Sequence, residues 1–201
     1  MSLRTAWVPC LILVVAGCTP HSAAPDLACP PRTLPTVRVT RLPEVVVRRN
    51  VDLVNATNRG RLAVLRTLFE GFGCEGPNLV EKPAHLFRQP NLSCTLPGER
   101  AERIVVGARF NKPTDGSERV DNWSGASLLP ALRLSLGQRP RHHTFEFVAL
   151  SSDERGPVGA RSFVSELGED ELRRVRAMVQ IDGIGTGALR AELRHSDPEL
   201  L

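Results

Sequence analysis

The sequence predicts an α/β fold with a mostly parallel central sheet that is flanked by helices. Three apolar runs rich in β-branched residues predict strands, at residues 103–110, 144–150 and 176–181. Segments with helical features lie before and between them, at residues 44–72, 124–136 and 158–167. Strands that alternate with helices at this spacing are typical of α/β proteins with a parallel sheet.

The elements follow one another from residue 44 onward. Residues 44–72 are predicted to hold an amphipathic helix. Its apolar side chains recur at helical spacing and glycines end it: Leu62, Leu65, Leu68, Phe69, Gly71 and Gly73. Two short strand-like runs follow, around Cys74 and at residues 91–96. In the helix predicted at 124–136, Pro130 is expected within or near the first turns, because proline disrupts a helix interior.

Length and composition exclude several classes of protein. A chain of 201 residues with 41% hydrophobic content fits one ordinary globular domain. The net charge of +4 includes no block of Lys or Arg, so a nucleic-acid partner is not expected. No apolar stretch of about 18 residues occurs beyond the N-terminus, which excludes a polytopic membrane protein. The five cysteines form no paired CxxC motif, which disfavours a structural zinc module.

The N-terminal residues predict an export signal. Arg4 provides a short positive region, and a mainly apolar run follows at residues 7–15. The motif Val15-Ala16-Gly17-Cys18 then resembles the lipobox of bacterial lipoproteins. That resemblance implies a signal peptide at residues 1–17, cleavage before Cys18 and a diacylglycerol group on its sulfur. The alternatives are an ordinary signal peptide or a short core segment.

This signal predicts the organisation and the location of the chain. Residues 18–43 are rich in proline and are predicted to be an extended tether from the lipidated Cys18. Residues 44–201 are predicted to be the α/β domain. Thr19 is not Asp, so the usual retention signal for the inner membrane is missing. The expected location is the cell envelope, on the outer membrane if the bacterium has two membranes, with the lipid as the membrane contact.

Cysteine positions predict one disulfide. Disulfides persist outside the cytoplasm, and Cys29, Cys74 and Cys94 remain besides Cys18 after the expected cleavage. Cys74 and Cys94 flank two short segments that can pair as neighbouring strands, so we expect a bridge between them. Cys29 lies in the proline-rich tether and is left over.

Acidic residues lie beyond each of the three predicted strands. Functional residues of open α/β sheets gather just beyond the C-terminal ends of the strands. Asp121 lies beyond the first strand, Asp153 and Glu154 follow the second, and Asp182 follows the third. Four carboxylates at one edge repel one another, so a cation is expected among them. The alternative is a set of solvated loop acids, with Asp121 capping the next helix.

Six ordered segments carry a family resemblance. In chain order they are NLSCTLPG at 91–98, IVVGA at 104–108, DNWSG at 121–125, FVALSSDERG at 147–156, GARSF at 159–163 and IDGIG at 181–185. Together they resemble the co-catalytic zinc aminopeptidases, metallopeptidase family twenty-eight, which includes leucyl-type aminopeptidases, glutamate carboxypeptidases and glutaminyl cyclases. The resemblance covers roughly residues 44–187. It implies a zinc-exopeptidase-like fold, incomplete at the C-terminus, one or two zinc ions and a peptide substrate.

The resemblance also implies roles for the acidic residues. Asp121 corresponds to the carboxylate that bridges two zinc ions, and the peptide bond after it is usually cis in the family. Glu154 and Asp182 correspond to further zinc ligands, and Asp153 corresponds to the general base. In that chemistry two zinc ions lower the pKa of a shared water, and the base takes its proton for attack on a peptide carbonyl.

The sequence departs from the family at several of these positions. Arg109 and Asn111 stand where the family has a zinc-binding His and the Asp that orients it. A guanidinium has no acceptor and cannot bind a metal ion, so Arg109 is expected to neutralise a carboxylate by a buried, bidentate ion pair. Asp153 is one methylene shorter than the Glu of the family. The last His of the family would lie beyond Leu201, and the strands expected there are missing, which predicts an open sheet edge.

These observations leave three hypotheses. The first is an envelope lipoprotein whose aminopeptidase-like domain is degenerate and catalytically impaired but still binds a peptide or a protein partner. The second is an active metal-dependent hydrolase that cleaves peptide bonds with Asp153 as the base and the other three carboxylates as ligands. The third is a non-enzymatic lipoprotein that has inherited only the fold.

Overall fold

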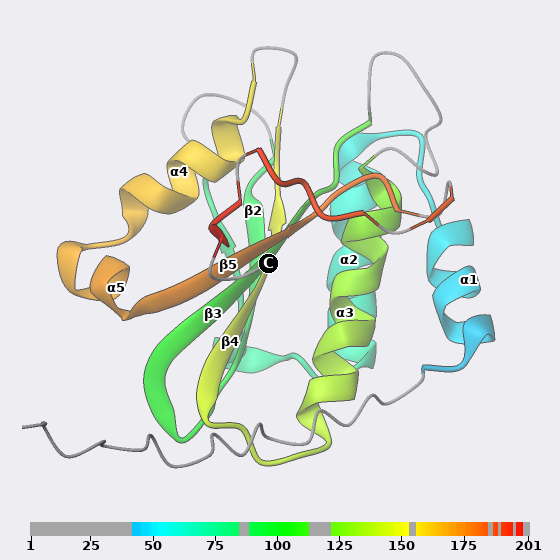
Figure 1. Ribbon diagram of the computed structural model, residues 1–201. Helices are drawn as coiled ribbons and strands as arrows, with labels where there is room; N and C mark the ends of the chain where they lie inside the picture. Colours follow the sequence, from blue (N-terminus) through cyan, green and yellow to red (C-terminus); the bar gives the residue numbers. More distant parts are fainter. Residues whose placement is uncertain are drawn as a thin grey trace, which may run out of the picture. The chain divides into compact units, whose positions relative to one another are not determined.

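The described part of the chain forms a five-stranded sheet with helices on both faces (Figure 1). The computed structural model describes residues 42–84, 89–112, 122–152 and 156–184, with the short pieces 187–188, 190–194 and 196–198. All of these residues belong to one unit of the chain, Val39–Leu201. The expected signal peptide, the tether up to residue 41 and the lipidation site Cys18 lie outside the described residues.

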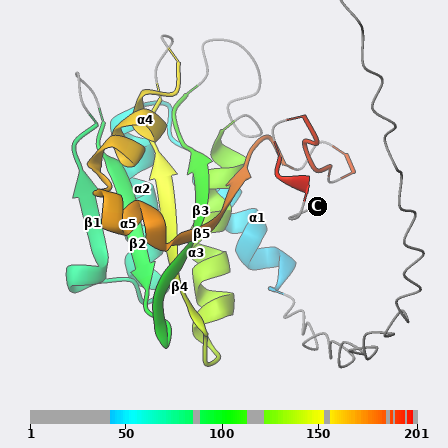
Figure 2. The ribbon, with the colours of Figure 1, turned by 60° about the vertical axis from the view of Figure 1, so that its left-hand side comes forward.

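The sheet combines parallel and antiparallel pairs. Its strands are β1 (Leu79–Lys82), β2 (Asn91–Leu96), β3 (Arg100–Arg109), β4 (His143–Leu150) and β5 (Val175–Ile181). Their spatial order is β1-β2-β4-β3-β5, which Figure 2 shows from one edge to the other. The pairs of β3 with β4 and with β5 are parallel, whereas β1 with β2 and β2 with β4 are antiparallel. The predicted α/β class is confirmed, with the parallel part of the sheet confined to three strands.

Five helices accompany the sheet in the described residues. They are α1 (Glu44–Asp52), α2 (Asn58–Gly71), α3 (Trp123–Gly137), α4 (Val158–Glu166) and α5 (Glu169–Arg174). α2 and α3 cover one face, with α1 packed against α3, and α4 and α5 lie on the opposite face (Figures 1 and 2).

The segment 44–72 forms two helices instead of the one that its periodicity predicts. The break lies at Thr57, which has an extended backbone (φ −117°, ψ 146°). Its hydroxyl oxygen accepts a hydrogen bond from the backbone N–H of Gly60 at 3.0 Å. Threonine caps a helix N-terminus in this way, and the capped helix then begins at Asn58. Pro130 lies in the middle of α3 rather than near its start.

The expected strand around Cys74 is wrong. Gly73 and Gly76 adopt positive φ angles of 83° and 59°, a conformation that favours glycine, and they turn the chain away from an extended path. A short 3-10 helix, Gly76–Asn78, follows and leads into β1.

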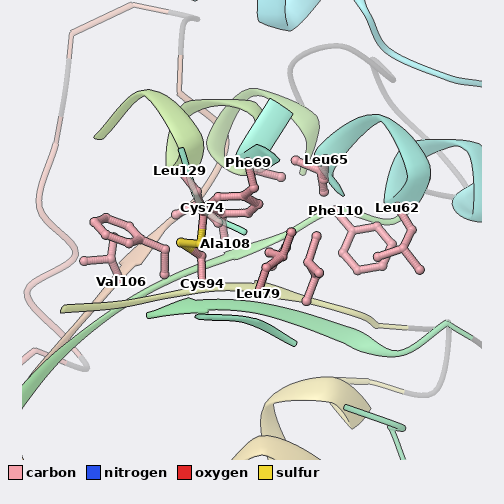
Figure 3. Packing of buried hydrophobic residues seen from close by; sticks show 14 of the residues in the cluster. Leu62, Leu65, Phe69, Cys74, Leu79, Cys94, Val106, Ala108, Phe110 and Leu129 are labelled. Atoms are coloured by element: carbon pink, nitrogen blue, oxygen red, sulfur yellow. A yellow bond between two sulfur atoms is a disulfide. The ribbon is translucent and has the colours of Figure 1, made fainter. Parts of the chain in front are cut away.

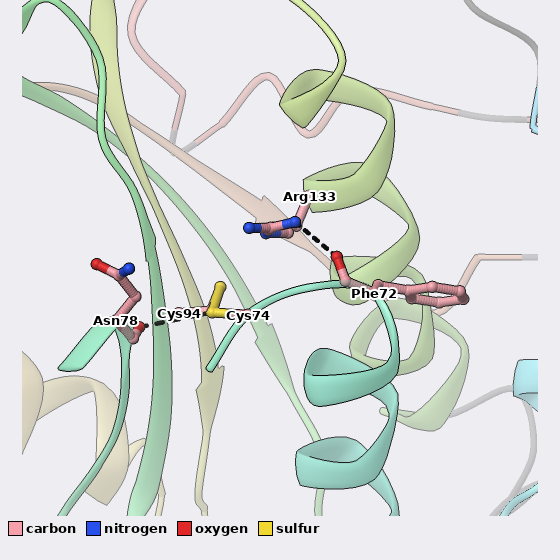
Figure 4. Close-up of a disulfide and its surroundings, with 5 residues drawn as sticks. All are labelled: Phe72, Cys74, Asn78, Cys94 and Arg133. Carbon is pink, nitrogen blue, oxygen red and sulfur yellow. Dashed lines mark hydrogen bonds between the residues drawn. A yellow bond between two sulfur atoms is a disulfide. The ribbon is translucent and has the colours of Figure 1, made fainter. Parts of the chain in front are cut away.

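A disulfide joins Cys74 to Cys94, the pair expected from the sequence (Figure 4). It links the end of α2 to the sheet strand β2, and both cysteines are fully buried. Next to it, Arg133 of α3 donates a hydrogen bond of 2.6 Å to the carbonyl oxygen of Phe72. The turn after α2 is therefore held from two sides, by the sheet and by the neighbouring helix.

The main hydrophobic core lies between the sheet and the helices α2 and α3 (Figure 3). Leu65 and Phe69 of α2 are fully buried there against Ala108 of β3 and the disulfide. A smaller cluster packs α4 onto the other face through Phe163, Val105, Val148 and Leu150. Helices on both faces explain why β3 and β4 are apolar on both sides toward their C-terminal halves.

Candidate functional site

The C-terminal ends of the three parallel strands lie side by side. Arg109 at the end of β3 pairs with Leu150 at the end of β4. On its other side, Ala108 of β3 pairs with Ile181 at the end of β5. The residues that follow these strands therefore reach one edge of the sheet, where α/β proteins place their functional residues.

Arg109 and Asp182 form an ion pair at this edge. A terminal guanidinium nitrogen (Nη2) of Arg109 lies 2.7 Å from a carboxylate oxygen of Asp182. The two side chains are 39% and 45% exposed, so the expected buried pair is instead a half-exposed one with a single close contact. Solvent screens such a pair, which limits its contribution to stability to about 1 kcal/mol or less. The pair nevertheless places the positive charge of Arg109 next to the carboxylate of Asp182, which the family resemblance implies as a zinc ligand.

Asn111 connects the chain after β3 by hydrogen bonds to the segment after β4 and to the start of α3. Its side chain is buried, and its amide nitrogen donates a hydrogen bond to the carbonyl oxygen of Ser152, beyond β4. The backbone carbonyl oxygen of Asn111 accepts a hydrogen bond of 3.0 Å from the side-chain amide of Asn122, just before α3. An Asn in this position can donate the bond to Ser152, whereas an ionised Asp can only accept.

Asn122 begins α3 in an uncommon backbone conformation. Among the residues that the structure describes, Asn122 is the one non-glycine residue with a positive φ, of 60°. Such a conformation costs of order 1–3 kcal/mol and persists only where surrounding contacts hold it. Here the side-chain bond to the carbonyl oxygen of Asn111 and the packing of the neighbouring, fully buried Trp123 do so.

A fully buried Arg61 lies beneath the same edge. Its guanidinium donates to the carbonyl oxygens of Asn55 (2.8 Å) and Phe110 (3.2 Å) and lies 5.8 Å from the centre of the Trp123 ring. The burial of Arg61 was not predicted from the sequence. A signal was present, because Arg61 stands four residues before Leu65 on the apolar face of its helix, where a charged residue needs buried partners.

Asn91 connects the end of β4 to α4. Its side-chain oxygen accepts a hydrogen bond of 2.9 Å from the N–H of Ser151, and its amide nitrogen donates one of 2.8 Å to the carbonyl oxygen of Gly159. The N–H of Gly159 in turn donates to the carbonyl oxygen of Ser151 at 3.0 Å. These bonds position the start of the chain segment that leads to Asp153 and Glu154.

Three of the predicted site residues, Asp121, Asp153 and Glu154, lie outside the described residues, as does the peptide bond after Asp121. Their expected roles remain predictions. In the described part of the chain, no group of three or more His, Cys, Asp and Glu side chains is arranged to hold a metal ion.

Arg109 does not fit the zinc-ligand position that the resemblance implies. Its guanidinium offers no lone pair, and its nitrogen instead contacts the carboxylate of Asp182.

Comparison with known proteins relates the domain to aminopeptidases. No model of a known protein family matches the chain. Leucine aminopeptidase 1 of Ajellomyces capsulatus is 30% identical over 135 residues, 59% of this chain and 34% of the relative. A probable lipoprotein aminopeptidase of Mycobacterium tuberculosis, LpqL, is 26% identical over 118 residues, 57% of this chain and 24% of the relative. The chain thus spans about a third or less of the length of these relatives.

A solved structure supports the same relationship at the level of the fold. The LapA aminopeptidase of Legionella pneumophila superposes with a TM-score of 0.55 and 22% sequence identity, covering 69% of this chain and 41% of LapA. The described domain therefore has an aminopeptidase-like α/β fold, as the resemblance in sequence implies. None of the helices in the described residues is long and apolar enough to cross a membrane.

Proposed function

We propose that this protein is a lipoprotein of the cell envelope whose aminopeptidase-like domain has lost zinc-dependent hydrolysis and binds a peptide or a protein partner. The ion pair between Arg109 and Asp182 is the observation that carries this proposal. It replaces a metal–ligand contact by a contact between two side chains, at the edge where the aminopeptidase resemblance implies zinc.

The substitution changes the chemistry of the position. An imidazole offers a lone pair to zinc, but the guanidinium of Arg109 stays protonated and offers none. Its positive charge also opposes the binding of a cation nearby. Asn111 supports the same interpretation, because its amide donates to the carbonyl oxygen of Ser152 and cannot orient an imidazole as a carboxylate does.

The remaining edge is suited to binding. Both members of the ion pair are half exposed, so a ligand can reach them. A guanidinium and a carboxylate held 2.7 Å apart present opposite charges that match the polar groups of a peptide. The named aminopeptidase activity of the relatives supports a peptide as the ligand class.

Two observations support export to the envelope. The bridge between the buried Cys74 and Cys94 is of the kind that persists in oxidising compartments. One relative is named as a lipoprotein aminopeptidase, which agrees with the lipobox-like motif that ends at Cys18.

The test compares wild type with Arg109→His, which restores an imidazole at the position. The full chain is dialysed against trace zinc, its metal content is measured by elemental mass spectrometry, and hydrolysis of leucine p-nitroanilide is followed. We expect no stoichiometric zinc and no hydrolysis in the wild type. Arg109→His is the matched control, and we expect it to retain more zinc than the wild type.

The opposite result would favour the active hydrolase. One or two zinc ions per chain in the wild type, lost in Asp121→Ala, together with hydrolysis that a chelator abolishes, would contradict the proposal. It would support Asp121, Glu154 and Asp182 as ligands and Asp153 as the base.

A further inference from the structure

The end of the sheet opposite to the candidate site is rich in arginine and histidine. The parallel strands β3 and β4 begin at this end, since their C-terminal ends form the edge described above. The turn from α3 to β4 lies here as well. The sequence from residue 122 to residue 145 contains no acidic residue, and its titratable side chains are all basic: Arg133, Arg139, Arg141, His142 and His143.

The positive side chains of this end lie close together at the surface. Arg100 begins β3 and pairs in the sheet with His143, which begins β4. The backbone N–H of Arg100 donates to the carbonyl oxygen of His142 at 2.9 Å. Arg100 and Arg139 are exposed, and the side chain of His142 is 54% exposed. We call the surface formed by Arg100, Arg139, Arg141 and His142 the basic rim.

Arg141 holds the basic rim in place. Its Nε and Nη2 donate to the carbonyl oxygen of Pro97, at 3.1 and 3.0 Å, and its Nη1 donates to that of Arg139 at 2.6 Å. These bonds connect the turn before β4 to the turn before β3. Carbonyl oxygens bind a guanidinium without neutralising its charge. Burial and the nearby charge of Arg141 lower the pKa of Arg133, which agrees with an excess of positive charge at this end.

Two carboxylates lie near the basic rim. The side chain of Glu99 is 68% exposed, and its carboxylate lies 3.5 Å from Nδ1 of His142. The pKa of Glu102 is lowered, chiefly by its own backbone N–H and further by the positive charge of Arg100. The acidic side chains of α5 instead form ion pairs with arginines of α5 and β3. The three arginines of the basic rim therefore outnumber the two carboxylates, and protonation of His142 adds to the excess.

The described chain begins near the same end of the domain. α1 runs antiparallel to α3, because residues at the end of α1 contact the start of α3. The indole N–H of Trp123 donates to the carbonyl oxygen of Val51 at 3.0 Å, and the side-chain amide of Asn50 donates to that of Ser127 at 3.3 Å. α1 therefore begins on the side where α3 ends, as Figures 1 and 2 show. A membrane anchor upstream of residue 42 would hold the domain by this end.

We infer that the basic rim rests on anionic phospholipid headgroups of the membrane, so that the candidate site at the opposite end of the sheet faces away from the bilayer. This orientation rests on the proposed lipoprotein, whose lipid keeps an anionic surface close to the end where the described chain begins. Each arginine that comes within a Debye length of such a surface strengthens binding about fivefold. A basic surface adds a second membrane contact to a lipid anchor.

Binding to lipid vesicles tests this surface. The parent protein is the full chain with Cys18→Ser, so that no lipid can attach to that sulfur. Its sedimentation with vesicles of phosphatidylcholine is measured with and without added phosphatidylglycerol. We expect binding to depend on phosphatidylglycerol and to fall with salt, because salt screens exposed charges. The rim variant Arg100→Gln/Arg139→Gln should bind the anionic vesicles at least about tenfold more weakly than the parent.

Arg59→Gln/Arg161→Gln is the matched control, which removes two exposed arginines from the end of the domain with the candidate site. Next to Arg59, the side chain of Asn58 accepts a hydrogen bond of 2.7 Å from the backbone N–H of Lys112, just beyond β3. Arg161 lies in the first turns of α4, which contacts Ser151 beyond β4. The control should bind vesicles like the parent, and circular dichroism checks that all variants are folded.

Lipidation is measured separately, by the intact mass of the wild type after expression in a bacterial host. Vesicle binding of Cys18→Ser does not depend on that lipid, so a wild type without lipid would contradict the lipoprotein and leave the result for the basic rim valid. Three results would overturn the inference: binding that does not depend on phosphatidylglycerol, a rim variant that binds like the parent, or an equal loss of binding in both double variants.

Discussion

Removing the disulfide between Cys74 and Cys94 is expected to lower the free energy of unfolding by about 3 kcal/mol. The bridge closes a loop between cysteines 20 positions apart in the sequence. For a loop of this length, the lost entropy of the unfolded chain corresponds to about 3 kcal/mol at 25 °C. Both sulfur atoms lie in the core between α2 and the sheet, so Cys74→Ala/Cys94→Ala also leaves a small unfilled volume. The lost packing adds to the effect of loop closure, so the free energy of unfolding should fall by at least about 3 kcal/mol.

Urea unfolding followed by circular dichroism measures this loss. The double variant should show a lower midpoint and a slightly larger dependence on urea, because its unfolded chain is less compact. Cys29→Ala is the control, since Cys29 is left over in the expected pairing, and it should unfold like the wild type. A loss below about 1 kcal/mol in the double variant would refute the argument that the loop closure stabilises this fold.

Three further substitutions test the packing around the site. Gly159→Ala should lower stability by about 2 kcal/mol or more in urea unfolding, because its Cβ would clash with the carbonyl oxygen of Ser151; a stable variant would contradict this close contact. Arg61→Met should cost about 1–3 kcal/mol in the same assay, since the buried carbonyl oxygen of Phe110 and the partly buried one of Asn55 lose their donor, and a neutral effect would argue against this role. Arg109→Ala should change stability by about 1 kcal/mol or less, with a smaller effect at high salt, and a larger loss would show that the pair with Asp182 is not screened.

Local patterns in the sequence were sufficient to predict the strands that form the parallel part of the sheet. The runs at 103–110, 144–150 and 176–181 are apolar and β-branched, and the structure has strands at these places. The segment 44–72 was predicted less well, because helical periodicity continues across Thr57 while the backbone does not. The strand expected around Cys74 failed because two glycines with positive φ turn the chain there.

The candidate site was predictable only in part. The rule that functional residues follow the C-terminal ends of parallel strands brought Arg109 and Asp182 into one neighbourhood, and they form an ion pair. The sequence did not indicate that this pair would be half exposed. The spacing of Arg61 from Leu65 indicated its burial, but not its contacts with Trp123 and the carbonyl oxygen of Phe110. Burial of a long side chain depends on which helix face meets which strand, and this is a property of packing.

The sequence by itself determined the class of fold and the chemical identity of the residues at the strand ends, because these depend on local periodicity and residue type. It also indicated the pair Cys74 and Cys94, although the strand expected around Cys74 does not form. Only the tertiary structure decided the order of the strands, the ion pair between residues 109 and 182, and the contacts of the buried Arg61. Those features join segments far apart in the chain, and their geometry follows from how the helices and strands pack as a whole.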